Sequence, residues 1–167
     1  KKYDIFGAFV VGLATAIGGG TLRDVLLDVP VFWLQNPWHL ICTFIALVIY
    51  LAFKPLVIRF GETVMLFDTL GLALFNITGI KTALAAGQTM LVAVIMGVVT
   101  GCAGGLMRDL LTQDPPLILQ RKEIYAVACL LGGVCYAAGA ALGVNDIALQ
   151  IISIVVVVAV RIVSRAR

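Results

Sequence analysis

The stretch Gly18–Asp24, with the sequence GGGTLRD, places three glycines and two opposite charges inside an otherwise apolar run. A second copy, Ala103–Asp109 with the sequence AGGLMRD, follows 85 residues later. The same offset aligns further residues of the two copies, namely Gly12 with Gly97, Thr15 with Thr100, Leu26 with Leu111, Pro30 with Pro115 and Leu34 with Leu119. Self-similarity at one fixed offset indicates an internal duplication.

The composition excludes an ordinary soluble domain. Hydrophobic residues make up 62% of the 167 residues and charged residues 13%, against about 45–50% and about 25% in soluble proteins. The mean hydropathy is +1.10. A chain with lipid as its solvent spans the membrane as helices or as a closed barrel, and the long apolar runs lack the alternation of a barrel. The sequence therefore predicts an all-α, polytopic membrane protein.

Six apolar segments are long enough to cross a bilayer core of roughly 30 Å, which takes about 20 helical residues. They cover approximately Asp4–Asp28, Trp38–Phe53, Glu62–Ala86, Thr89–Gln113, Ile124–Leu142 and Asp146–Val163. Because the 85-residue offset contains three of these spans, the second copy enters the membrane from the opposite side. Inverted repeats of this kind place a substrate or ion path near the membrane midplane.

The repeat divides the chain into three parts. Residues 1–61 form the first repeat, residues 62–144 the second, and residues 145–167 a C-terminal transmembrane helix. The span 62–86 opens the second repeat but has no counterpart in the first. We therefore expect a further spanning helix before Lys1, which would give seven helices in all.

The distribution of basic residues predicts the orientation. One side of the membrane receives Lys1, Lys2, Lys54, Arg59, Arg121, Lys122, Arg161, Arg165 and Arg167. The other side receives only Lys81, so the positive-inside rule makes the first side and both chain ends cytoplasmic. Because the net charge of +3 comes from residues at segment ends, it does not indicate a nucleic-acid partner.

The glycines predict a local break in two spans. Glycine costs about 1 kcal/mol relative to alanine in a helix interior, so we expect a break or kink at Gly18, Gly19 and Gly20, and another at Gly104 and Gly105. Carbonyl groups freed by a break, together with the hydroxyls of Thr15 and Thr100, would offer hard oxygen ligands to a cation. The alternative is close packing of unbroken helices through small residues.

The charged residues inside the spans require partners. Arg23 and Arg108 are expected toward opposite mouths of one path, and a charge at such depth costs at least about 2.5 kcal/mol unless it is paired or hydrated. Successive helical side chains point about 100° apart, so Arg23 and Asp24 are not expected to satisfy each other alone. Partner candidates lie on the third span: Asp68, Asn76 and Lys81. The alternative is that these charges reach the lipid headgroups.

No residue set indicates catalysis. The four cysteines lie in apolar segments without metal-binding spacing, and His39, next to Trp38, is interpreted as a membrane-interface residue. The sequence contains no HExxH motif, no phosphate-binding loop and no Ser/His/Asp grouping. We therefore do not expect an enzyme or a bound cofactor.

The two glycine-arginine-aspartate stretches resemble those of the prokaryotic trimeric intracellular cation (TRIC) channels. The resemblance extends to Pro30 with Phe32–Leu34 and to Pro115–Leu117, and it covers the whole chain. It implies a homotrimer in a prokaryotic inner membrane, with a pore in each protomer lined by the glycine-rich helices of both repeats. Potassium is the implied permeant ion, with sodium also passing, and membrane lipid is a possible ligand.

On this resemblance we expect a potassium channel whose path includes Thr15, Gly18–Gly20, Asn76, Thr100, Gly104 and Gly105. Arg23 and Arg108 would be held by carboxylates such as Asp24 and Asp109 and would act as gates or structural ties. The alternative is an alternating-access carrier of a small solute such as glycine, because inverted repeats suit that mechanism equally. A purely structural membrane subunit is a third possibility, although it explains neither the paired glycines nor the paired charges.

Overall fold

The computed structural model describes residues 4–59, 61–119 and 124–165, and these residues contain helices and loops but no strand. The long helices are α1 (Ile5–Leu26), α3 (Trp38–Arg59), α4 (Gly61–Ala85), α5 (Met90–Thr112), α6 (Tyr125–Ala141) and α7 (Asp146–Arg165). A short helix, α2 (Phe32–Gln35), and a 3-10 turn, η1 (Leu117–Leu119), lie in the loops. The six expected segments are therefore confirmed as helices, each within a few residues except where α3 continues past Phe53.

The order of elements repeats with the offset read from the sequence. Adding 85 residues carries α1 onto α5, α2 onto η1 and α3 onto α6, whereas α7 follows the second copy as an extra helix. The helix ends also correspond, because Asp28 after α1 and Gln113 after α5 both have a left-handed φ of 54°. The proposed boundaries at residues 61 and 144 stay predictions.

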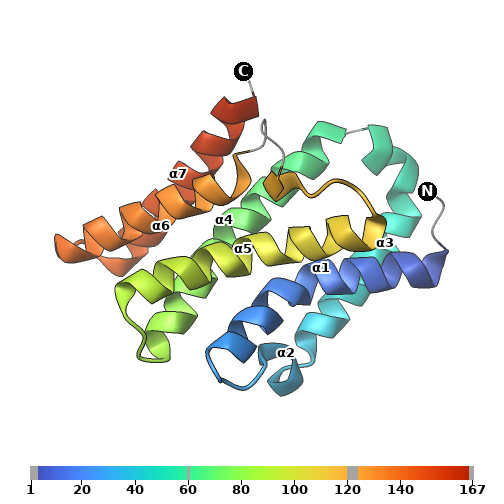
Figure 1. Ribbon diagram of the computed structural model, residues 1–167. Coiled ribbons are helices and arrows are strands. Elements are labelled where there is room, and N and C mark those ends of the chain that lie inside the picture. The colour runs from blue at the N-terminus through green and yellow to red at the C-terminus, as the bar shows by residue number, and fades with distance from the viewer. Residues whose placement is uncertain (1–3, 60, 120–123, 166–167) are drawn as a thin grey trace.

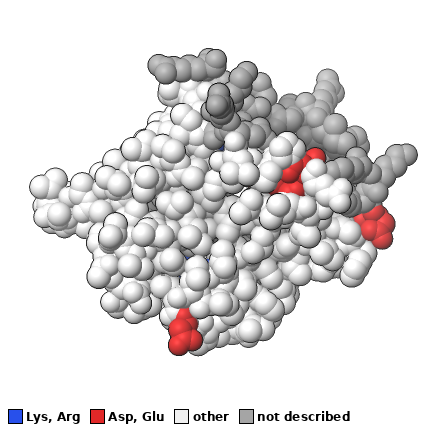
Figure 2. Space-filling model, in the orientation of Figure 1, with Lys and Arg blue, Asp and Glu red and all other residues white. Residues whose placement is uncertain are grey.

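Within the described part of the chain, three helices are apolar and long enough to cross a membrane by length and composition: α1, α5 and the part of α7 from Asp146 to Ser164. Two shorter apolar helices cover Trp38–Phe53 and Tyr125–Ala141. The backbone of α3 leaves helical dihedral angles at Phe53, which ends its apolar part. Figure 2 shows a face on which acidic and basic side chains are scarce among the described residues, as lipid contact requires.

Helix α5 lies at the centre of the bundle and packs against α1, α4 and α6, while α7 packs against α6 and α4 (Figure 1). Two apolar clusters hold the second repeat together, one around Leu72 and Cys129 and the other around Ile80 and Tyr136. In α1, by contrast, the only buried residues are Gly18, Gly19, Arg23 and Asp24. The repeated motif is therefore what attaches α1 to the bundle.

The basic residues used for the orientation lie largely outside the described part of the chain. Lys1, Lys2, Arg121, Lys122 and Arg167 fall there. The cytoplasmic location of both ends therefore stays a prediction.

Candidate functional site

The two glycine-rich helices cross in an antiparallel arrangement, backbone against backbone. A Cβ atom on Gly104 would lie 2.5 Å from the carbonyl oxygen of Thr15, and one on Gly19 would overlap the carbonyl oxygen of Thr100. Gly104 and Thr100 are the repeat equivalents of Gly19 and Thr15, so the symmetry of the repeat turns one contact into the other. The crossing of α1 and α5 (Figure 1) is therefore the point where the two inverted copies meet.

The expected helix breaks are absent. Helices α1 and α5 continue without interruption through Gly18–Gly20 and through Gly104–Gly105, so the prediction of broken helices is wrong, whereas a kink, the other form of that expectation, stays a prediction. The physical reason is that an intact helix pairs its own backbone groups in lipid, while the missing side chains let two helices approach closely. The glycines serve this close packing, which was the alternative interpretation.

The threonines at the crossing are oriented by their own helices. Thr15 Oγ1 donates to the carbonyl oxygen of Val11 at 2.7 Å, and Thr100 Oγ1 donates to that of Met96 at 2.6 Å. The two bonds are equivalent in the repeat, because Thr100 and Met96 follow Thr15 and Val11 by 85 residues. Because each hydroxyl proton is used within the helix, the oxygen lone pairs remain available to a partner outside it.

The rest of the first motif attaches the loop that follows α1. Gly20 lies directly under the ring of Phe32, leaving no room for a Cβ atom. Thr21 Oγ1 accepts a hydrogen bond from Trp33 Nε1 at 2.9 Å. Gly18 faces the sulfur atom of Met107 on α5. One turn of α1 thus contacts α5 on one side and α2 on the other.

Arg23 and Asp24 pair directly with each other, as the hypothesis of arginines held by carboxylates expected and against the argument from the 100° angle. Arg23 Nη2 lies 2.6 Å and Nε 2.8 Å from Asp24 Oδ1, and the two side chains are only 5% and 2% exposed. The argument from the 100° angle failed because the long arginine side chain folds back around the helix to its neighbour. Burial also excludes an Arg23 side chain extended to the headgroups.

Asp24 has a second hydrogen-bond partner. Its Oδ2 atom accepts the backbone N–H of Phe32 at 2.9 Å, and in the second copy Asp109 Oδ2 accepts that of Leu117 at 2.9 Å. Arg108 Nε likewise lies 3.0 Å from Asp109 Oδ1. Each arginine-aspartate pair therefore holds the first residue of the short helix or turn in the loop that follows.

The second copy has additional charge partners. Arg108 Nη1 lies 3.1 Å from Asp68 Oδ1 on α4, and the other oxygen of Asp68 lies 3.6 Å from Arg161 Nη2 on α7. Arg161 also lies over the ring of Tyr125, 4.7 Å from its centroid. Asp68 is thus a partner of Arg108, as the sequence suggested, and it connects three helices.

The other partner candidates do not reach either arginine of the motifs. Asn76 is fully buried, and its amide nitrogen donates to the carbonyl oxygen of Cys129 at 3.1 Å. Lys81 forms an exposed ion pair of 2.8 Å with Asp146. Gly105 lies against the hydroxyl group of Tyr125. All of these contacts join helices of the second repeat and α7.

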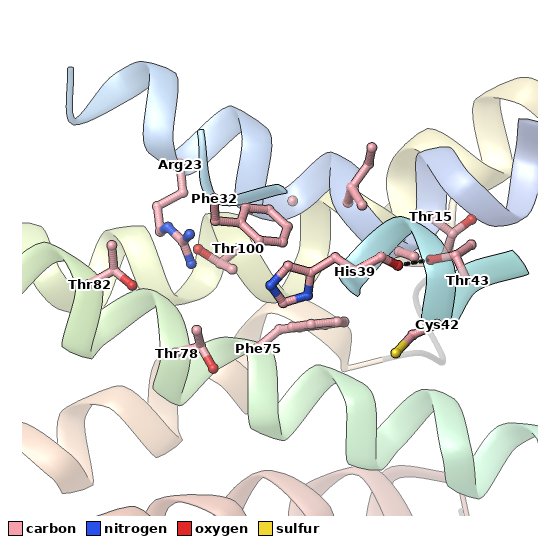
Figure 3. A pocket seen from close by; sticks show the side chains of 14 residues that line it. Thr15, Arg23, Phe32, His39, Cys42, Thr43, Phe75, Thr78, Thr82 and Thr100 are labelled. Carbon is pink, nitrogen blue, oxygen red and sulfur yellow. Dashed lines mark hydrogen bonds between the residues drawn. The ribbon is translucent and has the colours of Figure 1, made fainter. Parts of the chain in front are cut away.

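A cavity of about 510 Å³ lies beside the crossing, between α1, α3, α4 and α5. Figure 3 shows its side chains converging from these helices and from α2. Five predicted path residues or charges line it: Thr15, Gly19, Gly20, Arg23 and Thr100. The remaining predicted residues are not among its lining residues: Gly18, Asn76, Gly104, Gly105, Asp24, Asp68, Lys81, Arg108 and Asp109.

Sequence reasoning missed the part of the cavity wall that comes from α2, α3 and α4. The missed residues with polar or aromatic side chains are Phe32, His39, Cys42, Thr43, Phe75, Thr78 and Thr82. His39, interpreted above as an interface residue, extends into the cavity (Figure 3). The spacing of Thr78 and Thr82, one helical turn apart on one face of α4, was the signal that could have revealed this wall.

The arrangement offers neutral oxygen ligands and one compensated charge. Threonine residues from α1, α3, α4 and α5 line the cavity, and hydroxyl oxygens are ligands of the hard type that cations accept. The Arg23 charge is balanced by Asp24 at 2.6 Å. Among the described residues no group of three or more His, Cys, Asp or Glu side chains could hold a metal ion.

These features define a multi-pass membrane protein built from two inverted copies that cross at paired glycines. The family model described as "Glycine transporter" matches residues 1–55 and 65–141. The chain belongs to this family.

Bacterial membrane proteins are similar over most of the chain. The UPF0126 inner membrane protein YadS of Escherichia coli K12 is 43% identical over 140 residues, which is 81% of this chain and 66% of that protein. A UPF0126 membrane protein of Vibrio cholerae is 40% identical over 150 residues, covering 87% and 61%. The chain thus spans 61–66% of the length of these relatives.

Solved structures confirm the resemblance to the TRIC channels. The TRIC trimeric intracellular cation channel orthologue of Rhodobacter sphaeroides matches with a TM-score of 0.85 and 29% identity, over 97% of this chain and 94% of that one. A second TRIC cation channel matches with a TM-score of 0.86 and 30% identity, over 98% and 80%. These relatives are membrane proteins and cation channels and not enzymes, which agrees with the lack of a catalytic motif.

Proposed function

We propose that this protein is a cation channel that conducts potassium, and to a lesser extent sodium, through the threonine-lined cavity beside the α1–α5 crossing. The observation that carries the proposal is that threonine residues from four helices line a cavity of about 510 Å³. Partial replacement of the hydration shell by neutral oxygens is how channels pass alkali cations. The likeness to TRIC cation channels of known structure supports it.

The arginines are compatible with this proposal because each is neutralised locally. A bare guanidinium in a narrow path would raise the barrier for a cation. The guanidinium group of Arg23 pairs with Asp24 through Nη2 and Nε, and that of Arg108 pairs with both Asp109 and Asp68. Since Arg23 lines the cavity and Arg108 does not, we assign the gating role to Arg23 and a structural role to Arg108.

The relatives support a proposal for the assembly and location of the protein. We propose a homotrimer with one path in each protomer, in a prokaryotic inner membrane, with lipid as its partner and without nucleic acid. The Rhodobacter sphaeroides neighbour is a trimeric channel, and the Escherichia coli relative is an inner membrane protein. The chain ends described above would lie in the cytoplasm by the positive-inside rule. No cofactor beyond the permeant ion is needed.

The native thiol of Cys42 tests the path directly. Cys42 is exposed and lines the cavity. A positively charged methanethiosulfonate reagent should attach to it and suppress most of the potassium current in planar bilayers. The physical reason is that the attached group adds bulk and positive charge to the conduction path.

The matched control is Cys42→Ser, which should conduct like the wild type and be insensitive to the reagent. Cys102 and Cys129 are buried, so they should not react, and Cys135 is half-buried but does not line the cavity, so labelling there should not reduce the current. A wild-type current that persists after complete labelling of Cys42 would place the ion path elsewhere.

A carrier of a small solute such as glycine is the second candidate. It is favoured by Arg23, whose guanidinium group lines the cavity and could bind a carboxylate. It is also favoured by the description of the matching family model. Recording in asymmetric KCl, with and without glycine, separates the two. Discrete steps reversing near the potassium equilibrium potential support the channel, whereas saturable uptake of labelled glycine without steps supports the carrier.

A further inference from the structure

We propose that the aromatic ring of Phe32 is the constriction of the cavity and that Asp24 sets its position. This inference rests on the proposed function, because a constriction matters only if solutes pass through the cavity. It assigns a role to the loop between α1 and α3, which no sequence motif identified as part of the path.

The ring of Phe32 lines the cavity and lies close to three other lining residues. It lies against Gly20, whose missing side chain makes room for it. The centroid of the ring is 5.8 Å from the guanidinium carbon of Arg23 and 4.7 Å from the ring centroid of His39, which meets it edge to face at 74°. Figure 3 shows Phe32 and His39 side by side within the cavity. The ring therefore projects from the cavity wall beside Arg23 and His39.

Two hydrogen bonds attach the short helix that carries this ring. The backbone N–H of Phe32 donates to Asp24 Oδ2 at 2.9 Å, and Trp33 Nε1 donates to Thr21 Oγ1 at 2.9 Å. Helix α2 has only four residues and no side-chain cap of its own. Its position therefore depends on these contacts with the repeated motif of α1.

Asp24 couples the ring to the arginine. One oxygen of this carboxylate holds Arg23 at 2.6 Å and the other holds the backbone of Phe32 at 2.9 Å. A displacement of Arg23 moves the carboxylate, and the carboxylate moves the start of α2. The pair therefore transmits a change in the charge environment of the cavity to the ring that narrows it.

The second repeat shows that the hydrogen bond alone does not make a constriction. Leu117 stands at the position of Phe32, and its backbone N–H is held by Asp109 Oδ2 at 2.9 Å in the same way. Its side chain, however, packs against the apolar cluster that contains Leu72 and Tyr125 and does not line the cavity. The loop attachment is common to both copies, whereas the constricting ring is specific to the first.

The physical effect of the ring follows from its apolar surface. A hydrophobic constriction excludes water and thereby raises the barrier for a hydrated ion. The threonine hydroxyls of the cavity can replace water along the wall, but Phe32 offers no oxygen ligand. Removing the ring should therefore ease passage, and enlarging it should hinder passage.

The test is single-channel recording of the intact protein with a size series at Phe32. We expect the unitary potassium conductance to increase from Phe32→Trp to the wild type, then to Phe32→Leu and to Phe32→Ala. Phe32→Leu introduces the residue that the second repeat already carries, so it guards against a variant that fails to fold. Leu117→Ala is the matched control, because it keeps the same backbone hydrogen bond and should leave the unitary conductance unchanged.

A second variant tests the coupling. Asp24→Asn keeps an oxygen acceptor for the Phe32 N–H but removes the charge that holds Arg23, so the open probability should change more than the unitary conductance. A conducting wild type that is blocked at Cys42, combined with equal conductance across the Phe32 series, would overturn the constriction alone. A wild type without current steps would overturn the ion path and this inference together.

Discussion

Replacing Gly19 with alanine is expected to destabilise the folded protein by about 3 kcal/mol, at the upper end of the cost of overpacking. The added methyl group would overlap the carbonyl oxygen of Thr100, which belongs to the backbone of α5 and cannot rotate away. Gly104→Ala should have a similar effect, because its Cβ atom would lie 2.5 Å from the carbonyl oxygen of Thr15. Thermal unfolding in detergent, together with the yield of folded protein, measures both.

Two other glycines provide controls. Gly18 is next to Gly19 in sequence, but it faces the flexible side chain of Met107, and the second repeat carries Ala103 at the equivalent position. A methyl group added at Gly71 on α4 would meet no atom of the described residues within 4 Å. Gly18→Ala and Gly71→Ala should therefore be tolerated. Equal stability of Gly18→Ala and Gly19→Ala variants would contradict the backbone-to-backbone crossing.

The arrangement of helices was predictable from the sequence because it depends on average properties. The apolar runs gave six spans, and the 85-residue offset between Gly19 and Gly104 gave their inverted repetition. Both signals extend over many residues, so local errors average out. The same offset relates the contacts of Thr15 and Thr100 across the crossing, which makes the repeat visible in the packing as well as in the sequence.

The details of the site were less predictable because they depend on side-chain reach and on contacts between distant segments. Propensity indicated a break at Gly18–Gly20, but the α1–α5 contact favours continuous helices. The angle between neighbours argued against the Arg23–Asp24 pair, which forms because arginine is long and flexible. His39 and Thr78 reach the cavity only through the packing of α3 and α4, which the duplication of the glycine motif does not specify.

Asp68→Asn is expected to destabilise the protein by about 1–3 kcal/mol, between the cost for an exposed ion pair and that for a fully buried one, because the side chains of Arg108 and Asp68 are 31% and 19% exposed. Asp68 lies 3.1 Å from Arg108 and 3.6 Å from Arg161, and its own side chain is 19% exposed. The substitution removes the anion that lies between two guanidinium groups, one half-buried on Arg108 and one buried on Arg161. It should therefore loosen α7 from α4 and α5, which thermal unfolding of the purified protein would detect.

The exposed ion pair of Lys81 with Asp146 provides the comparison. Its two side chains are 45% and 52% exposed, and exposed pairs contribute about 0–1 kcal/mol, so Asp146→Asn should have a small effect. If both substitutions lowered stability equally, burial would not be what makes Asp68 important. A combined Asp68→Asn and Arg161→Gln variant tests whether repulsion between the two arginines contributes to the loss of stability. It removes one of the two cations that the carboxylate of Asp68 had neutralised. Partial recovery of stability in this variant would show that repulsion between Arg108 and Arg161 contributes to the cost of Asp68→Asn.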